Sequence, residues 1–238
     1  MKRLPGKPEM TSAELQTPDG PLSLVRPGGG DKSLRAWDAA DELLLQTAGT
    51  VLQDWPSPKV LVVDDQFGAL TLGLARFSPE LVADNAGLAE ALERNARENP
   101  AISGIAQPAS WQNPPSGPFD LVVVRIPRQA DYLAWLLRWL NGVLSEQGRI
   151  LAGGMIKHLP DRSVDVFAEA VVTEQVFPAR KKARVVMCSR GAASPCDWPG
   201  LWKGYDLGNG IRVEALPAVF AREKLDIGTR LLLPRVTE

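Results

Sequence analysis

The chain has 238 residues, of which 45% are hydrophobic and 23% charged, so it can bury the core of one large domain, alone or with an added fragment, and is not wholly disordered. Its 27 basic and 28 acidic residues give a net charge of -1, which excludes a globally basic protein that wraps nucleic acid but allows local basic patches. No apolar run approaches the roughly 18 to 20 residues that span a bilayer, and the basic start leads into Pro5 and Gly6, so we expect a cytoplasmic protein without a membrane segment.

The first 33 residues are rich in proline and glycine, and we expect them to be irregular apart from one hairpin. Apolar residues alternate on both sides of Thr17-Pro18-Asp19-Gly20, a sequence typical of a tight turn. A helix is predicted to begin after Ser33, whose hydroxyl can cap the first amides. The residues that then share one apolar face at helical spacing are Leu34, Trp37, Ala40, Leu44 and Leu45.

From residue 59 onward, short apolar runs alternate with helical patterns. The runs lack polar alternation, which is typical of strands buried on both faces of a parallel sheet. They occupy residues 59–63, 81–84, 119–124, 149–152 and 183–188. The helical patterns occupy residues 69–76, 87–98, 132–140 and 161–171. This alternation predicts an α/β fold with a doubly wound, mainly parallel sheet and helices on both faces.

The pattern changes after the last of these strands. Residues 189–200 are rich in Ser, Ala, Pro and Gly and predict a loop, and residues 201–213 predict a hairpin whose turn is 207–210. The segment 219–234 begins a new amphipathic helix with nothing to bury it. We therefore expect the chain to be cut from a longer protein.

Ligands of an open parallel sheet bind beyond the carboxyl ends of its strands, so the segment after the first strand is the first place to search. Nucleotide-binding sheets place glycines there because the cofactor approaches the backbone closely. Compared with the Asp-x-Gly-x-Gly-x-Gly pattern of S-adenosylmethionine-dependent methyltransferases, the chain keeps Asp64 and Gly68 but has Gln66 and Leu70 at the other two glycine positions. We expect the protein's own side chains to fill this cofactor site.

Two later positions can also be compared with those of methyltransferases. Asp84 follows Asp64 at about the spacing of an acidic residue that binds a cofactor ribose, but Asp also caps helices, and we favour the capping role. After the strand 119–124, amino-directed methyltransferases carry Asn-Pro-Pro-Tyr or Asn-Pro-Pro-Phe, where Asn accepts hydrogen bonds from the target amine. This chain has Arg125-Ile126-Pro127-Arg128 instead. Because arginine only donates, we predict phosphate contacts here and no catalytic residue.

The inventory of sulfur and imidazole groups is small. There are two cysteines, Cys188 and Cys196, and one histidine, His158. These are too few for a Cys/His zinc site, so we expect no metal, and a histidine-based triad is excluded unless His158 meets a nucleophile. The cysteines are most simply reduced thiols with a structural role.

Basic residues cluster around the strand 183–188, at the edge where the two arginines after residue 124 are expected to emerge. Such a cluster suits a phosphate backbone, although solvated strand ends also carry Arg and Lys. The candidate RNA-binding residues are Arg125, Arg128, Arg180, Lys181, Lys182, Arg184 and Arg190.

Residues 34–45, 64–70, 181–184 and 220–230 together resemble the N-terminal half of the bacterial ribosomal RNA large subunit methyltransferase G family, guanine-N2 methyltransferases of 23S ribosomal RNA. The small-subunit methyltransferase C family is a close relative. The resemblance covers nearly the whole chain from about residue 15. It implies a tandem duplication, in which the N-terminal copy has lost its cofactor site and a C-terminal copy binds S-adenosylmethionine and transfers the methyl group.

The resemblance implies three parts: an irregular segment with a hairpin (1–33), a degenerate methyltransferase-like, Rossmann-like domain (34–200), and a hairpin that leads into a missing catalytic domain (201–238). We expect a monomer that binds ribosomal RNA and its own C-terminal catalytic domain and holds no cofactor itself, with Asp64, Gly68 and Asp84 as remnants. Two alternatives remain open. The chain is a scaffold of a 16S ribosomal RNA guanine-N2 methyltransferase that never contacts RNA, or an active enzyme with a rearranged pocket formed by Asp64, Asp65 and Asp84.

Overall fold

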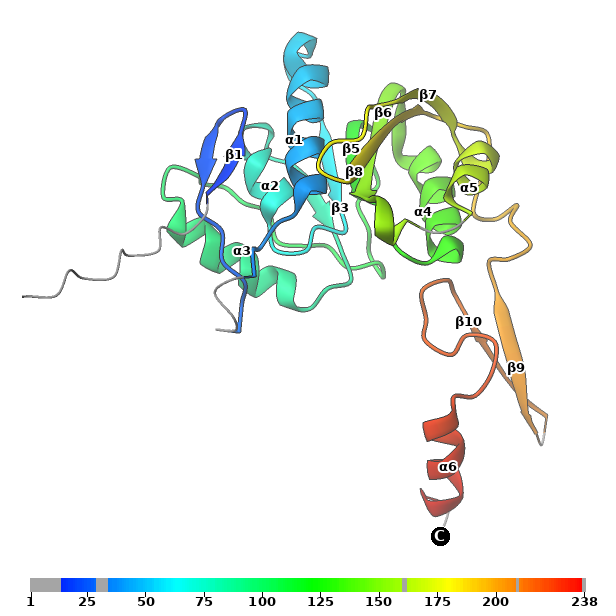
Figure 1. The fold of residues 1–238 in the computed structure, drawn as a ribbon. Coiled ribbons are helices and arrows are strands. Elements are labelled where there is room, and N and C mark those ends of the chain that lie inside the picture. Colours follow the sequence, from blue (N-terminus) through cyan, green and yellow to red (C-terminus); the bar gives the residue numbers. More distant parts are fainter. Residues whose placement is uncertain (1–13, 29–33, 160–161, 209, 237–238) are drawn as a thin grey trace, which may run out of the picture.

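The computed structural model describes residues 14–28, 34–159, 162–208 and 210–236, and a central sheet lies between two layers of helices (Figure 1). The six strands of the sheet lie in the order β4-β3-β5-β6-β8-β7. In that order their bounds are Glu80–Val82, Val60–Val63, Phe119–Arg125, Leu144–Met155, Ala183–Ser189 and Val172–Val176. The first four are parallel, and β8 runs antiparallel to both β6 and β7. The predicted α/β fold with a mainly parallel sheet is confirmed.

One face of the sheet is covered by the helices of the first half of the chain. These are α1 (Ala39–Val51), α2 (Ala69–Gly73) and α3 (Gly87–Glu98). Successive side chains of a strand point to opposite faces, so Val60 and Val62 of β3 pack against this layer. The predicted bounds of α3 agree with the structure, because its apolar face is regular and Pro100 follows its end.

The predicted N-terminal hairpin is present and contributes to the core. It consists of β1 (Leu15–Thr17) and β2 (Gly20–Leu22), which pair antiparallel. Leu15 and Leu22 are buried in the same apolar cluster as α1 and β3. The described part of the expected N-terminal segment is therefore continuous with the main domain in its packing.

The other face of the sheet is covered by α4 (Ala130–Val143) and α5 (Ser163–Ala170). The alternate residues of β3, Leu61 and Val63, pack into this second cluster. An aromatic group lies on the outer side of α4. Its rings belong to Trp111, Tyr132, Trp135 and Trp139, and Trp111 meets Trp135 edge to face with 4.9 Å between ring centroids. These partly buried rings pack against the apolar cluster on this face of the sheet.

Helix α1 begins later than predicted. Its N-cap is Asp38, whose carboxylate accepts hydrogen bonds from the amides of Ala40 and Asp41 at 2.8 and 3.4 Å. The Asp41 carboxylate accepts from the Asp38 amide at 2.9 Å, so the two residues form a reciprocal capping box. The prediction that Leu34 and Trp37 lie in this helix is wrong, and Ser33 lies outside the described residues.

Three other element bounds differ from the predictions. Strand β6 begins at Leu144 and ends at Met155, whereas the predicted strand covered only residues 149–152. Strand β7 was not predicted because all five of its residues are exposed and carry no apolar pattern. Helix α5 begins at Ser163 with Val164 exposed, and the expected start at Asp161 lies outside the described residues. Short 3-10 helices η1, η2 and η3 occupy Leu52–Asp54, Ala75–Phe77 and Ile156–His158.

The C-terminal segment extends away from the sheet (Figure 1). It contains the predicted hairpin, formed by β9 (Lys203–Gly208) and β10 (Ile211–Ala215), and then α6 (Ile227–Val236). The helix starts later than the expected position 219, and every residue of α6 is exposed. In the ranges that the structure describes, no helix is long and apolar enough to cross a membrane.

A buried arginine attaches this segment to the main domain, next to Lys203 of β9, whose Nζ atom also binds the Asp131 carboxylate at 3.0 Å. The Arg222 side chain is 8% exposed and donates to the Asp131 carboxylate of α4 at 2.8 Å. It also donates to the carbonyls of Leu201 and Ala215 at 2.7 and 3.0 Å, and to that of Gly200. Arg222 therefore ties the base of the hairpin to the first turn of α4.

Candidate functional site

A hollow of about 340 Å³ lies at the carboxyl ends of β3, β5 and β6, where an open parallel sheet is expected to bind its ligand. Four segments surround it: the stretch before α1, the turn between β3 and α2, the loop between β5 and α4, and η3 after β6. The polar side chains of its lining are Arg26, Asp38, Asp64, Gln66, Arg125, Arg128 and His158.

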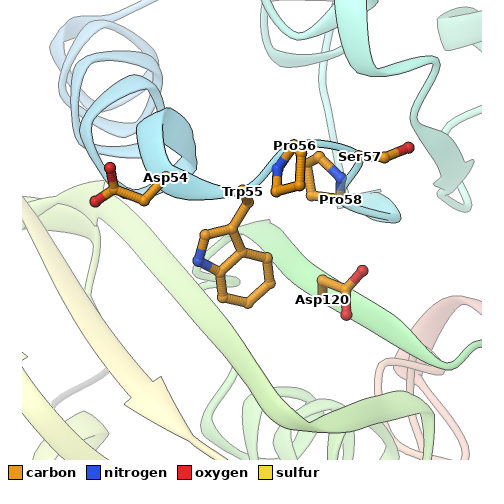
Figure 2. Close-up of a pocket in the computed structure, with 6 residues that line it drawn as sticks. All are labelled: Asp54, Trp55, Pro56, Ser57, Pro58 and Asp120. Atoms are coloured by element: carbon orange, nitrogen blue, oxygen red, sulfur yellow. The ribbon is translucent and has the colours of Figure 1, made fainter.

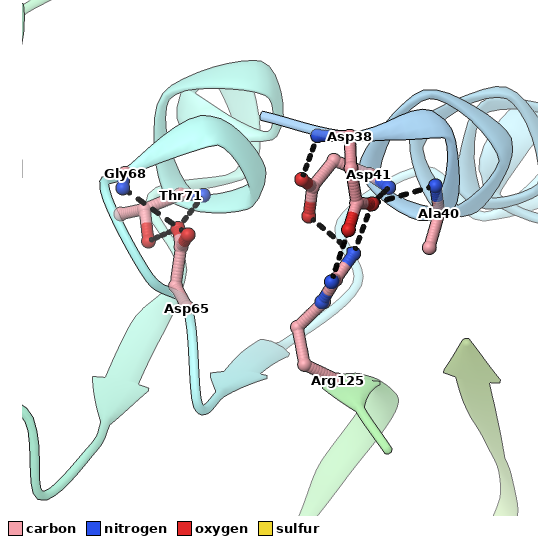
Figure 3. A network of polar contacts seen from close by, with 7 residues as sticks. All are labelled: Asp38, Ala40, Asp41, Asp65, Gly68, Thr71 and Arg125. Atoms are coloured by element: carbon pink, nitrogen blue, oxygen red, sulfur yellow. Dashed lines mark hydrogen bonds and ion pairs between the residues drawn. The ribbon is translucent and has the colours of Figure 1, made fainter. Parts of the chain in front are cut away.

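The turn between β3 and α2 is closed by its own hydrogen bonds. The Asp65 carboxylate is buried and accepts from the amide of Gly68 at 3.1 Å and from the amide and hydroxyl of Thr71 at 2.9 and 2.8 Å. Figure 3 shows the Asp65 side chain turned toward α2. Amides that begin a helix commonly bind an anionic ligand. Here the chain itself supplies the anion.

Gly68 has a packing reason of its own to be glycine. Its φ is +91°, which side-chain-bearing residues rarely adopt, and a Cβ at this position would lie 2.8 Å from the Leu92 Cδ2 atom of α3. Leu70, in α2, is fully buried in the core, whereas Gln66 is exposed at the rim of the hollow. Of the two residues expected to fill the site, only Gln66 therefore lines it.

Arg125 reaches from the end of β5 to the first turn of α1 (Figure 3). Its guanidinium donates to both carboxylate oxygens of Asp38 at 2.8 Å and to Asp41 at 3.0 Å. The side chains of Arg125 and Asp41 are 11% and 10% exposed. The donors of Arg125, a candidate RNA-binding residue, thus already face two carboxylates within the protein.

The charges of this network titrate differently because they are buried to different depths. Burial raises the pKa of Asp41 to about 7, although the nearby Arg125 opposes the rise. At Asp38 burial acts in the same direction, but hydrogen bonds from Arg125 and from the amides of Ala40 and Asp41 outweigh it, so the pKa of Asp38 is lowered. Arg125 consequently holds one fully ionised carboxylate and one that is part-protonated near neutral pH.

Asp64 ends β3 in a left-handed backbone conformation, with φ of 57°. Its carboxylate accepts a hydrogen bond from the Tyr132 hydroxyl of α4 at 2.9 Å. Burial raises the pKa of Asp64 to about 6, opposed by that hydrogen bond and assisted by the charge of Asp84. Burial and the adjacent Asp64 charge also raise the pKa of Tyr132. The hydroxyl therefore keeps its proton near neutral pH and donates it to Asp64.

The capping role predicted for Asp84 is wrong. The amide of Gly87 in α3 is bound by the Asn85 side chain at 3.0 Å, and Asn85 also donates to the Gln66 carbonyl at 3.1 Å. Asp84 itself is exposed at the end of β4. Asp64 and Asp84 lie close enough to influence each other, whereas Asp65 is buried against α2, so the three carboxylates do not share one pocket.

Three of the predicted RNA-binding residues are exposed at the carboxyl edge of the sheet. Arg128 lines the hollow from the loop after β5. Arg184 of β8 pairs with Gly154 near the end of β6, and the carbonyl of Lys182 accepts from the Ile156 amide at 2.9 Å. The structure thus brings Arg128, Lys182 and Arg184 to one edge, as expected.

The other predicted RNA-binding residues are placed differently. Arg180 donates to the Gln46 side chain at 2.8 Å, and Lys181 forms an ion pair with Glu42 at 2.6 Å, so both are bonded to side chains of α1. Arg190 follows Ser189, which pairs with Arg149, six residues before the end of β6. It therefore lies at the opposite edge of the sheet, about 20 Å from the carboxyl edge that carries Arg184. The expected single cluster is wrong for Arg190, because β8 runs antiparallel to β6.

Several residues of the site were not predicted from the sequence. Asp38 and Asp41 have the spacing of a capping box, a local signal that could have placed the start of α1. Their partner Arg125 is distant in sequence and leaves no local signal. Tyr132 was assigned to the apolar stripe of α4, although its hydroxyl binds Asp64. Arg26 and Lys157 are isolated cations in irregular segments.

A second hollow, of about 280 Å³, lies at the opposite edge of the sheet (Figure 2). It is lined by Asp54, Trp55, Pro56, Ser57, Pro58 and Asp120. The Asp120 carboxylate accepts from the Lys59 amide at 2.8 Å and from the Ser145 hydroxyl at 3.0 Å, which join the strand starts. These are structural bonds, and the lining offers neither a nucleophile with a base nor a cation.

Comparison with known proteins is consistent with this fold. The model of the family described as the RLMG N-terminal domain matches residues 12–192. A ribosomal RNA large subunit methyltransferase G from Pseudomonas syringae pv. tomato is 38% identical over 218 residues, which cover 90% of this chain and 57% of the relative. A protein of the same name from Pseudomonas putida is 37% identical, with 93% of this chain and 60% of the relative covered. The chain thus spans about three fifths of the length of these relatives.

Solved structures show the same fold at lower identity. The 16S rRNA N2 G1207 methyltransferase (RsmC) of T. thermophilus, in complex with AdoMet and guanosine, has a TM-score of 0.60 and 22% identity. The match covers 94% of this chain and 57% of that structure. A putative SAM-dependent methyltransferase from Streptococcus mutans has a TM-score of 0.51 and 10% identity, with 67% of this chain and 51% of that chain covered. At these identities the likeness concerns the fold.

Proposed function

The chain belongs to the RLMG N-terminal domain family, and from this premise we propose that it is the non-catalytic, RNA-recognising part of a 23S ribosomal RNA guanine-N2 methyltransferase. The observation that carries the proposal is the Arg125 network. At the strand end where amino-directed methyltransferases place an acceptor Asn, this chain has a guanidinium bound to Asp38 and Asp41. A guanidinium has no acceptor, so it cannot hold the amino group of a guanine for methyl transfer.

We propose further that this chain does not hold S-adenosylmethionine. The residues of the β3–α2 turn do not fit that cofactor, because Asp65 occupies the amides of Gly68 and Thr71. The space beside Gly68 is taken by Leu92, so this glycine serves internal packing. In the parent protein, S-adenosylmethionine binding and methyl transfer then belong to a C-terminal catalytic domain.

The RNA role is supported by exposed cations at the carboxyl edge of the sheet. Lys182 and Arg184 are exposed, and in the described part of the chain no carboxylate pairs with either side chain. Phosphate contacts by such side chains release counterions, so affinity falls with salt. We propose that this edge contacts ribosomal RNA as one face of a monomer.

The partner of the C-terminal segment is proposed to be the catalytic domain of the same protein. Phe220, in the turn before α6, is 82% exposed and Ile227 of α6 is 77% exposed, and Leu231 and Leu232 of α6 are exposed as well, so this segment presents several large apolar side chains to water. Covering them with a following domain would remove this apolar surface from water. The proposed organisation is thus a degenerate methyltransferase-like domain at about 34–200 and a connecting segment from about 201 onward.

Calorimetry tests the cofactor part of the proposal. Titration of the 238-residue chain with S-adenosylmethionine is expected to give no binding heat, and the full-length relative from Pseudomonas putida serves as the positive control. Stoichiometric, saturable binding to this chain would contradict the proposal, because it would require the β3–α2 turn to open.

RNA binding is tested with two double variants that remove the same charge. K182Q/R184Q changes the carboxyl edge, and R94Q/R190Q changes exposed arginines on α3 and at the opposite edge. We expect the first variant to weaken binding of a 23S ribosomal RNA fragment and to lower the slope of log affinity against log salt by about one to two, and the second to change little. Equal effects of both variants, or no RNA binding at all, would favour a scaffold without RNA contact.

A further inference from the structure

Two arginines and a histidine from three separate segments meet at the hollow beside β5 and β6. Arg26 comes from the stretch before α1, Arg128 from the loop after β5, and His158 from η3. Lys157, also in η3, lies close enough to His158 to influence its charge. These residues are far apart in sequence, so the fold itself gathers the cations.

The carboxylates of the hollow already have partners. Asp38 binds Arg125 through both oxygens, and Asp64 accepts from Tyr132. Arg128 and Lys157 have no carboxylate partner among the residues that the structure describes. Neither side chain therefore forms an internal ion pair, and the Asp64 carboxylate, bound by the neutral Tyr132 hydroxyl, adds one negative charge to the same hollow.

Arg26 is held at the rim by two contacts. Its Nε atom donates to the Arg35 carbonyl at 2.7 Å, and its guanidinium lies 4.9 Å from the centre of the Phe67 ring. Neither contact neutralises the charge. A guanidinium fixed in this way loses little side-chain freedom when an anion arrives, which favours binding.

The pKa of His158 depends on the charges around the hollow. Partial burial and the neighbouring charges of Arg128 and Lys157 lower its pKa, while Asp38 acts in the opposite direction and Arg125 adds a smaller lowering. Arg26 and Asp64 line the same hollow. The imidazole is therefore mostly neutral at pH 7. An anion placed among these cations would favour the protonated imidazole, which donates from both nitrogens.

We propose that this hollow binds a phosphate group, with Arg128 and protonated His158 as donors and Arg26 and Lys157 as the surrounding positive charge. The volume of about 340 Å³ is within the range of small-ligand clefts, and the site is open to solvent on the side of Arg128. The source of the phosphate rests on the function proposed above: a backbone phosphate of RNA, with free inorganic phosphate as the other source. The space that a cofactor would take in an active copy would then hold a polynucleotide.

The chain contains one histidine, so nuclear magnetic resonance can follow His158 without assignment. The pKa of His158 is measured in the 238-residue chain alone, with saturating inorganic phosphate, and with a single-stranded RNA oligonucleotide. We expect both additions to raise the pKa by about 0.5 to 1. R128Q and K157Q are expected to weaken phosphate binding about tenfold, while R190Q, an exposed arginine at the other edge, leaves it unchanged.

The outcomes separate this inference from the proposed function. A rise with both additions supports the site and assigns its phosphate to RNA, and a rise with inorganic phosphate alone supports the site with a free anion. If RNA binds in the salt titration but neither addition moves the pKa, the phosphate site is wrong and the RNA-binding function stands. Equal losses in R128Q and R190Q would also overturn the site, because binding would then follow net charge alone.

Discussion

Arg125 ends strand β5 and Arg128 lies three residues later in the following loop, yet the fold gives them opposite surroundings. Arg125 lies against Asp38 and Asp41 with 11% of its side chain exposed, whereas Arg128 is exposed and has no carboxylate partner among the described residues. The sealed region around Arg125 connects β5 to α1, and the open region around Arg128 is where we place the phosphate. Residue type alone therefore did not decide which arginine is free to bind a ligand.

The largest expected effect comes from breaking the sealed region. Arg125→Met removes the cation that two carboxylates share, and we expect the free energy of unfolding at pH 7 to fall by about 3 kcal/mol. The loss stays at the lower end of the range for a broken buried ion pair because Asp41, with a pKa of about 7, can take up a proton. Urea denaturation measures the change. Arg128→Met is the matched control and should lie within about 0.5 kcal/mol of the parent.

The second effect concerns Asp64, which borders both regions. Its pKa is about 6 in the folded protein against an ordinary 3.8. The folded state therefore binds more protons than the unfolded state between these values, and stability falls as pH rises from about 4 to 6. Asp64→Asn removes this loss and keeps an acceptor for Tyr132. We expect the variant to be about 2 kcal/mol more stable at pH 7.5 and equal to the parent near pH 3.5.

Denaturation curves of Asp64→Asn at these two pH values decide the point. An equal gain at both would mean that relief of the left-handed backbone, with φ of 57°, is the cause rather than the charge. Asparagine adopts this conformation more readily than most residues.

A smaller effect is expected from the turn beside Gly68. Thr71→Val keeps the shape of the side chain but removes the hydroxyl that donates to the buried Asp65 at 2.8 Å. Two backbone amides still bind Asp65, so we expect a loss of about 1 kcal/mol in the free energy of unfolding. Thr50→Val, on the exposed side of α1, is the control and should change stability by less than about 0.5 kcal/mol. A similar loss of stability in both variants would show that the hydrogen bond from Thr71 to Asp65 stabilises the fold no more than an exposed one.

The smallest change in the free energy of unfolding is expected for an ion pair whose lysine is exposed to solvent. Lys181 and Glu42 lie 2.6 Å apart, but the lysine side chain is 61% exposed. Lys181→Gln should change the free energy of unfolding by no more than about 0.5 kcal/mol at physiological salt. A loss above 1 kcal/mol in the same denaturation assay would mean that this contact, like that of Arg125, fixes the position of α1.

The strands of the sheet were predictable because burial on both faces leaves uninterrupted apolar runs such as Val60–Val63. The exposed strand β7 has no such pattern and was missed. The direction of β8 was equally hidden, since an apolar run reads the same in both directions, and the placement of Arg190 failed for that reason.

At the site, the sequence indicated the loss of the glycine pattern and of the acceptor Asn, both of which are local features. It did not indicate that Arg125 would find Asp38 and Asp41, because such pairs depend on how α1 lies against the end of β5. The cations at the hollow are gathered in the same way, from Arg26 to His158. Long-range side-chain pairing requires the three-dimensional arrangement.

The first turn of α4 contacts two parts of the molecule that are far apart in the sequence. Asp131 holds Arg222 of the C-terminal segment, and the next residue, Tyr132, holds Asp64 at the end of β3. Because a helical turn moves as one rigid piece, any shift that a docked domain imposes on Asp131 carries Tyr132 with it. A shift at Asp131 would then reach Asp64, while the rest of the helix, which is anchored in the core from Leu133 onward, stays in place.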